Sequence, residues 1–141
     1  MSDVPKSLKA KIIEQAKNRC GYCLSEQIRV YAPLEIEHII ARSRGGETIE
    51  ENLWLACPMC NRFKGKQIYG IDPKTKEMVS LFNPRTQIWK EHFEFSADGI
   101  EIIGKTIIGK ATVVALQLNN YLAVRTRKDW VKVGWYPPKD Y

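Results

Sequence analysis

Two spacings of apolar residues run through the first half of the chain. Between residues 7 and 18, apolar side chains recur every three or four positions with lysine and glutamate between them, which predicts a helix with Ser7 as its N-cap. Residues 34–39 instead alternate apolar and polar side chains, which is typical of a strand with one buried face. Residues 52–55 predict a second short strand.

A further helix should begin at Pro58 and end at Gly65, because proline suits the first helical position and glycine commonly follows the last. Beyond it the pattern is mixed. It predicts a turn at 72–75, a hairpin of 93–95 with 100–102 around an Asp-Gly pair, and helices over 106–118 and 122–133. These elements indicate an α+β fold.

The 141 residues are enough for one ordinary domain. A weak change in composition near residue 66 divides the chain into two parts. We expect residues 1–66 to form the helix, the two strands and the helix after them. We expect residues 67–141 to form an α+β extension that packs on the first part and is not an independent domain.

Four cysteines form two Cys-x-x-Cys pairs, Cys20 with Cys23 and Cys57 with Cys60, separated by 33 residues. Two such pairs are typical of one tetrahedral structural Zn²⁺ held by four thiolates. Disulfides are the alternative, but the sequence shows no export signal, and a reducing compartment keeps thiols free. A thiol redox protein would need only one pair, in a βαβ setting that is not found around either pair.

Charge points to an anionic partner. Lysine and arginine exceed aspartate and glutamate by 22 − 16 = 6, with nucleic acid as the first candidate partner. The sequence contains no run of 18 apolar residues that could span a membrane. Without a signal peptide, we expect the protein in the cytoplasm.

Polar residues with catalytic potential lie between and beside the cysteine pairs. They are Glu35, Glu37, His38, Asn52 and Asn61. If one zinc ion joins the two pairs, these side chains must lie close together in space. A histidine with a pKa near neutrality can take a proton from water, and hydrolysis of a phosphodiester bond needs such a base.

Oxygen atoms of Glu37 and Asn61 suit a hard cation such as Mg²⁺ or Mn²⁺, which would act on the phosphate. Glu35 is a rival ligand, since it shares a strand face with Glu37. The amide of Asn52 is expected to hold the loop between the strands, and with it the imidazole of His38.

The motif Glu37-His38-Ile39, then Gly45-Gly46, Asn52-Leu53 and Cys57-x-x-Cys60-Asn61 with Lys64, resembles the HNH endonucleases. The resemblance covers about residues 20–66 and implies a ββα-metal (His-Me finger) core. It implies hydrolysis of DNA with His38 as general base and Asn52 in its structural role. Asn61 replaces the histidine that gives the family its third letter, and Glu37 stands where aspartate is frequent; both variants occur in the family.

Basic residues near this motif are expected to contact phosphates of double-stranded DNA: Arg42, Arg44, Arg62, Lys64 and Lys66. The roles of Arg85 and His92 are left open, with His92 more typical of a packed histidine. The competing hypothesis is a non-catalytic zinc module that binds nucleic acid or protein. Cleavage of both strands commonly needs two active sites, so a dimer is compatible with the sequence, although no interface pattern indicates one.

Overall fold

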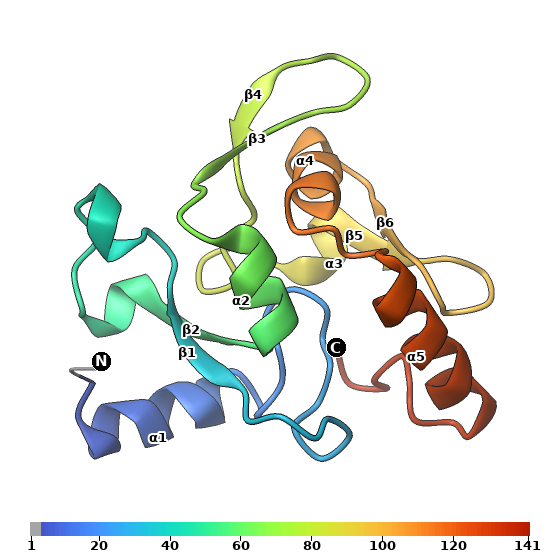
Figure 1. Cartoon of the computed structure of the whole chain (residues 1–141), viewed down its shortest axis with the longest axis horizontal. Coiled ribbons are helices and arrows are strands. Elements are labelled where there is room, and N and C mark those ends of the chain that lie inside the picture. Colours follow the sequence, from blue (N-terminus) through green and yellow to red (C-terminus); the bar gives the residue numbers. More distant parts are fainter. Residues whose placement is uncertain (1–3) are drawn as a thin grey trace.

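A computed structural model describes residues 4–141 and confirms the α+β class, with helices and small antiparallel sheets (Figure 1). Four cysteines form a cluster in this structure. The helices are α1 (Lys6–Gln15), α2 (Pro58–Lys64), α3 (Trp89–His92), α4 (Ile107–Ala115) and α5 (Tyr121–Lys132), with short 3-10 turns η1 (Arg42–Arg44) and η2 (Glu50–Asn52). The strands are β1 (Glu35–His38), β2 (Leu53–Ala56), β3 (Tyr69–Ile71), β4 (Met78–Ser80), β5 (Phe93–Phe95) and β6 (Ile102–Gly104). Among the described residues, no helix is long and apolar enough to cross a membrane.

The two strands predicted in the first half of the chain are confirmed within one residue at each end and pair antiparallel. Glu35 faces Ala56 and His38 faces Leu53, so the pair extends over the whole of both strands. Leu53 is fully buried, α1 packs against β2, and Ile12 of α1 is fully buried. The helix α2 lies on the other side of the pair and begins at Pro58, as predicted (Figure 1).

The first helix differs from its prediction at both ends. Pro5, and not Ser7, is the N-cap, and its carbonyl accepts the first helical hydrogen bond, from the Lys9 N–H at 3.0 Å. The helix ends at Gln15, because Lys17 and Asn18 adopt positive φ angles of 55° and 52°. This left-handed step turns the chain into the first cysteine pair.

The extension contains one hairpin that was not predicted and one whose register was wrong. β3 and β4 flank the predicted turn at 72–75, but each is only three residues long and too short to show a period. β5 pairs with residues 102–104 and not with 100–102. The turn is longer than Asp-Gly alone, because Ser96 N–H donates to Glu101 O at 2.9 Å and closes it.

One buried cluster joins the two parts of the chain. It contains all four cysteines and, from beyond residue 66, Phe82, Trp89 and Phe93 among others. The indole N–H of Trp89 donates to the backbone oxygen of Tyr22 at 2.8 Å, so the extension contacts the first cysteine pair directly.

Candidate zinc centre and candidate active site

The four cysteines meet in the interior, from two distant loops. Their sulfur atoms all lie within 4.8 Å of one another, and among the described residues this is the one group of three or more histidine, cysteine or acidic side chains so arranged. The Sγ atoms of Cys23 and Cys57 are 3.7 Å apart. A tetrahedral zinc site with Zn–S bonds of about 2.3 Å has sulfur–sulfur edges of about 3.8 Å. The cluster therefore fits one zinc ion.

Local structure presents these thiols for binding. Cys57 is the N-cap of α2, and its sulfur accepts a hydrogen bond from the Cys60 N–H at 3.3 Å. The Ser25 hydroxyl lies 3.0 Å from the Cys23 sulfur. Burial raises the pKa of the Cys20 thiol well above its usual range, whereas hydrogen bonds from the neighbouring thiols lower the pKa of Cys23. A cation among the four sulfur atoms would favour the thiolate form of all of them.

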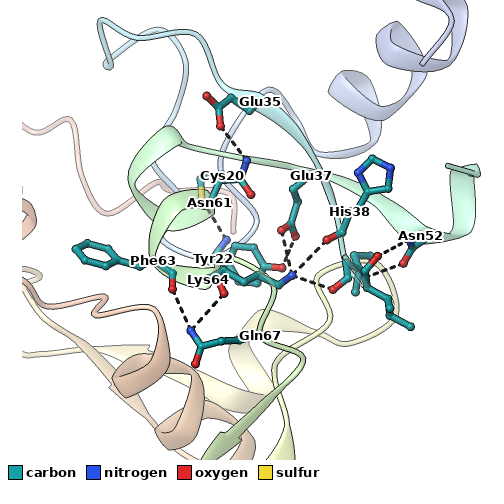
Figure 2. Close-up of polar contacts among 12 residues, drawn as sticks. Cys20, Tyr22, Glu35, Glu37, His38, Asn52, Asn61, Phe63, Lys64 and Gln67 are labelled. Atoms are coloured by element: carbon teal, nitrogen blue, oxygen red, sulfur yellow. Dashed lines mark hydrogen bonds and ion pairs between the residues drawn. The ribbon is translucent and has the colours of Figure 1, made fainter. Parts of the chain in front are cut away.

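His38 closes β1, and its ring points away from α2 (Figure 2). The imidazole is partly exposed, and its Nε2 lies 2.9 Å from the Thr48 hydroxyl. Burial lowers the pKa of His38, and the positive charges of Arg42 and Lys64 lower it further. A lowered pKa favours the neutral imidazole, which is the form that accepts a proton.

Asn52 joins the two ends of the loop that follows His38. Its Oδ1 accepts from the Ile40 N–H at 2.8 Å, while its Nδ2 donates to the oxygens of Ile40 at 3.0 Å and Glu47 at 2.9 Å. We call these three hydrogen bonds the Asn52 bracket. Gly46 packs against it, and a Cβ added at Gly46 would come 1.7 Å from the Ile40 oxygen. Only glycine fits there.

Glu35 and Glu37 point to the α2 side of β1, but their surroundings differ (Figure 2). Glu35 is exposed and its Oε1 accepts from Asn61 Nδ2 at 2.8 Å. Glu37 is buried, with only 2% of its surface exposed. The structure thus brings Asn61 into direct contact with the rival ligand, Glu35.

Two buried partners surround Glu37. The Tyr22 hydroxyl donates to its Oε1, and the Lys64 ammonium lies 3.5 Å from its Oε2. Burial raises the pKa of Glu37, and the charge of Lys64 opposes that rise. Lys64 also donates to the backbone oxygens of Ile39 at 2.8 Å and His38 at 3.3 Å. A phosphate contact was predicted for Lys64, but the structure buries its ammonium group beneath β1.

The other predicted phosphate contacts lie on the surface. Arg42 and Arg44 belong to the 3-10 turn after β1, and Arg62 and Lys66 lie on and just after α2; all four are exposed.

The two residues left open by the sequence make contacts within the fold. His92 Nδ1 lies 2.7 Å from the Thr106 hydroxyl and its ring packs edge-on against Phe82. The Arg85 guanidinium donates to the Leu53 oxygen at 3.0 and 3.1 Å and stacks 4.9 Å from the Trp54 ring centroid. Arg85 thus links the extension to β2.

Comparison with known families agrees with this geometry. Residues 20–67 match the HNH endonuclease family. No curated protein and no solved structure gives a significant match. The matched segment holds both cysteine pairs, β1, β2 and α2, and it indicates a nuclease or nucleic-acid-binding function.

Sequence reasoning missed two polar groups of the matched segment, the hydroxyls of Tyr22 and Thr48. Tyr22 lies inside the first Cys-x-x-Cys pair, and Thr48 is the second residue after the Gly45-Gly46 pair. Their positions within the two motifs were the available signal. Their partners lie 15 and 10 residues away, so the contacts themselves could not be deduced.

Proposed function

We propose that this protein is a metal-dependent endonuclease that hydrolyses phosphodiester bonds of double-stranded DNA, with His38 as the general base. The observation that carries the proposal is the environment of the His38 side chain and the contacts that hold it. Its imidazole is partly exposed and has a lowered pKa, its Nε2 lies 2.9 Å from the Thr48 hydroxyl, and it lies next to a loop that Asn52 fixes through three hydrogen bonds. A general base requires this combination of access, protonation state and orientation.

A divalent cation is the second part of the proposal. Oxygen donors from Glu37 and Asn61 would hold Mg²⁺ or Mn²⁺, which prefer oxygen ligands. Glu37 Oε2 has lone pairs left for this role, because it accepts no hydrogen bond from the described residues, although the Lys64 ammonium lies 3.5 Å away. When bound, the cation would neutralise charge that develops on the phosphate and on the departing oxygen.

DNA would be held by the exposed arginines of η1 and α2 together with Lys66. The arginines lie on the turn after His38 and on the helix that carries Asn61, and Lys66 follows that helix. Contacts of this kind position the duplex without reading its sequence, and they weaken as salt concentration rises. This chemistry requires neither a particular biological pathway nor a dimer.

A second function is favoured by one observation, the burial of Glu37. A carboxylate already paired with Lys64 and Tyr22 is not presented to solvent. This arrangement also suits a zinc-containing module that binds nucleic acid and does not cleave it. The two functions differ in whether the purified protein cleaves DNA.

The test is nicking of supercoiled plasmid by zinc-loaded protein. We expect relaxed plasmid in Mg²⁺ or Mn²⁺ and none when the catalytic cation is withheld under conditions that leave the zinc in place. Asn61→Ala should raise the Mg²⁺ concentration required. DNA binding without nicking in any divalent cation would favour the non-catalytic module.

A further inference from the structure

Tyr22 connects the cysteine cluster to the candidate active site. It lies between two cluster residues, Cys20 and Cys23, and is fully buried with its ring edge-on to Phe82. The Trp89 indole fixes its backbone oxygen at 2.8 Å. Its hydroxyl reaches out of the cluster and donates to Glu37 Oε1, as the close-up shows (Figure 2).

The two oxygens of Glu37 are held differently. Oε1 is engaged by the Tyr22 hydroxyl, whereas Oε2 is near a charge but accepts no hydrogen bond from the described part of the chain. The Lys64 ammonium lies 3.5 Å from Oε2 and directs its closer contacts to the Ile39 and His38 oxygens. The carboxylate is therefore fixed on one side, with coordination capacity left on the other.

We propose that Tyr22 is a positioning residue that transmits the geometry of the zinc centre to Glu37 and so sets the affinity for the second cation. The inference rests on the proposed function in one respect, that Glu37 is a ligand of this cation. Because Tyr22 belongs to the turn that presents two thiolates, its hydroxyl is directed at Glu37 only while the cluster keeps its shape. The geometry of the zinc site thereby fixes the position of the Glu37 carboxylate.

Removing the hydroxyl isolates this role. Tyr22→Phe keeps the ring, its packing and all four thiolates, but frees Oε1. The carboxylate can then turn toward Lys64 and pair with it more closely, which withdraws it from the cation. We expect Mn²⁺ to bind about tenfold more weakly, the smallest factor typical of losing one hydrogen bond to a charged group.

Tyr136 provides a matched control. It is also buried, and its hydroxyl also reaches the first cysteine pair, donating to the Cys23 oxygen at 2.6 Å, but it makes no hydrogen bond to Glu37. Zinc content of wild type, Tyr22→Phe and Tyr136→Phe is measured first, and we expect one equivalent in each. Mn²⁺ binding is then measured by titration calorimetry, and the nicking rate as a function of Mg²⁺ concentration.

The proposal predicts that Tyr22→Phe alone weakens Mn²⁺ binding and raises the half-saturating Mg²⁺ concentration, while the maximal rate recovers at high Mg²⁺. Unchanged Mn²⁺ affinity in zinc-loaded Tyr22→Phe overturns it, and so does equal weakening in both variants. A wild type that binds Mn²⁺ without nicking DNA refutes the nuclease function and still leaves the binding comparison decisive. A wild type that binds no Mn²⁺ refutes both.

A measurement that leaves Tyr22 in place covers the case in which Tyr22→Phe loses zinc. Cadmium replaces zinc in thiolate sites and reports their geometry by NMR. If Tyr22 links the two centres, saturating Mg²⁺ should shift the cadmium resonance of wild-type protein, and Tyr136→Phe should show the same shift. A cadmium resonance that does not respond to Mg²⁺, in protein shown by calorimetry to bind it, overturns the proposal.

Discussion

At the scale of single residues, Lys64 is unusual because its charge is buried. Its ammonium group contacts the Glu37 carboxylate and two backbone oxygens, and its exposed fraction is 2%. A buried ion pair adds little stability compared with apolar residues of similar size, but removing one partner leaves an unpaired buried charge. Lys64 therefore belongs to the interior of the fold and not to the exposed basic surface.

We predict that Lys64→Met lowers the free energy of unfolding by about 3–5 kcal/mol, because Glu37 then loses its counter-charge in the interior. Urea unfolding at fixed zinc content measures the change. Lys66→Met is the matched control, since Lys66 is exposed two residues away, and it should alter stability by no more than about 0.5 kcal/mol. Equal effects of the two substitutions would show that the ion pair does not support the fold.

Gly46 carries a second residue-scale prediction. Gly46→Ala places a methyl group against the Ile40 oxygen and must displace the loop that Asn52 fixes. We expect the nicking rate to fall by about a hundredfold, the order of a general-base contribution, while zinc content stays at one equivalent. Glu47→Ala, one residue further on, keeps its backbone oxygen for Asn52 and should leave the rate near wild type. A fully active Gly46→Ala would mean that the bracket does not position His38.

At the scale of elements, sequence patterns predicted what depends on local chemistry. The alternation at residues 34–39, the proline at the start of α2 and the two cysteine pairs each carry their signal within a few residues, and the structure agrees with all three. The β3–β4 hairpin was missed, because Tyr69, Ile71 and Met78 leave large apolar side chains exposed on one face. Such a pattern does not distinguish a strand from a loop.

In the candidate site, too, some features follow from local sequence and others depend on the assembled fold. The shared face of Glu35 and Glu37 follows from strand period alone. The burial of Glu37 does not, since it depends on Tyr22 and Lys64, which reach it from the cysteine turn and from α2. Which carboxylate is solvent-exposed is thus a property of the assembled fold.

The candidate zinc centre supports a prediction about elements, because its four cysteines come from the turn before β1 and from the start of α2. Cys57→Ala removes both a thiolate and the N-cap of α2. Since zinc binding energy is folding energy in such sites, we expect loss of zinc and of the cooperative unfolding transition. Elemental analysis and thermal melts test this. Ser25→Ala, which removes only a neighbouring hydroxyl, should retain one zinc; a Cys57→Ala protein with full zinc would contradict the assignment.

At the scale of the whole molecule, the C-terminal segment returns to the N-terminal part of the chain. Asp140 forms an ion pair with Arg19 at 2.7 Å, next to the first cysteine pair, and Tyr136 contacts the Cys23 oxygen. The shared buried cluster continues this connection through the interior. We therefore propose that residues 67–141 and residues 1–66 fold as one unit.

Asp140→Asn should lower the melting temperature by a few degrees at most, since the pair is partly exposed. The hydrogen bond and charge of Arg19 lower the pKa of Asp140 below its ordinary value of 3.8. A lowered carboxyl pKa gives stability that is complete above the unfolded-state value and is lost only as pH falls through the folded-state value. The difference from wild type should therefore be constant from about pH 8 to about pH 5.

Thermal melts across this range, with Asp129→Asn on the exposed surface of α5 as control, check the prediction. A difference that disappears before pH 5 would contradict the lowered pKa of Asp140 in the folded protein.

The central claim is that His38 takes the proton from the attacking water, and the two histidines of the chain allow a direct comparison. The measurement is the plasmid-nicking rate in Mg²⁺ of wild type, His38→Ala and His92→Ala, each with one equivalent of zinc and matched DNA affinity. We predict that His38→Ala loses a factor of about 10²–10⁴, the usual contribution of a general base, while His92→Ala stays close to wild type. A His38→Ala protein that nicks DNA within about threefold of the wild-type rate would contradict the mechanism.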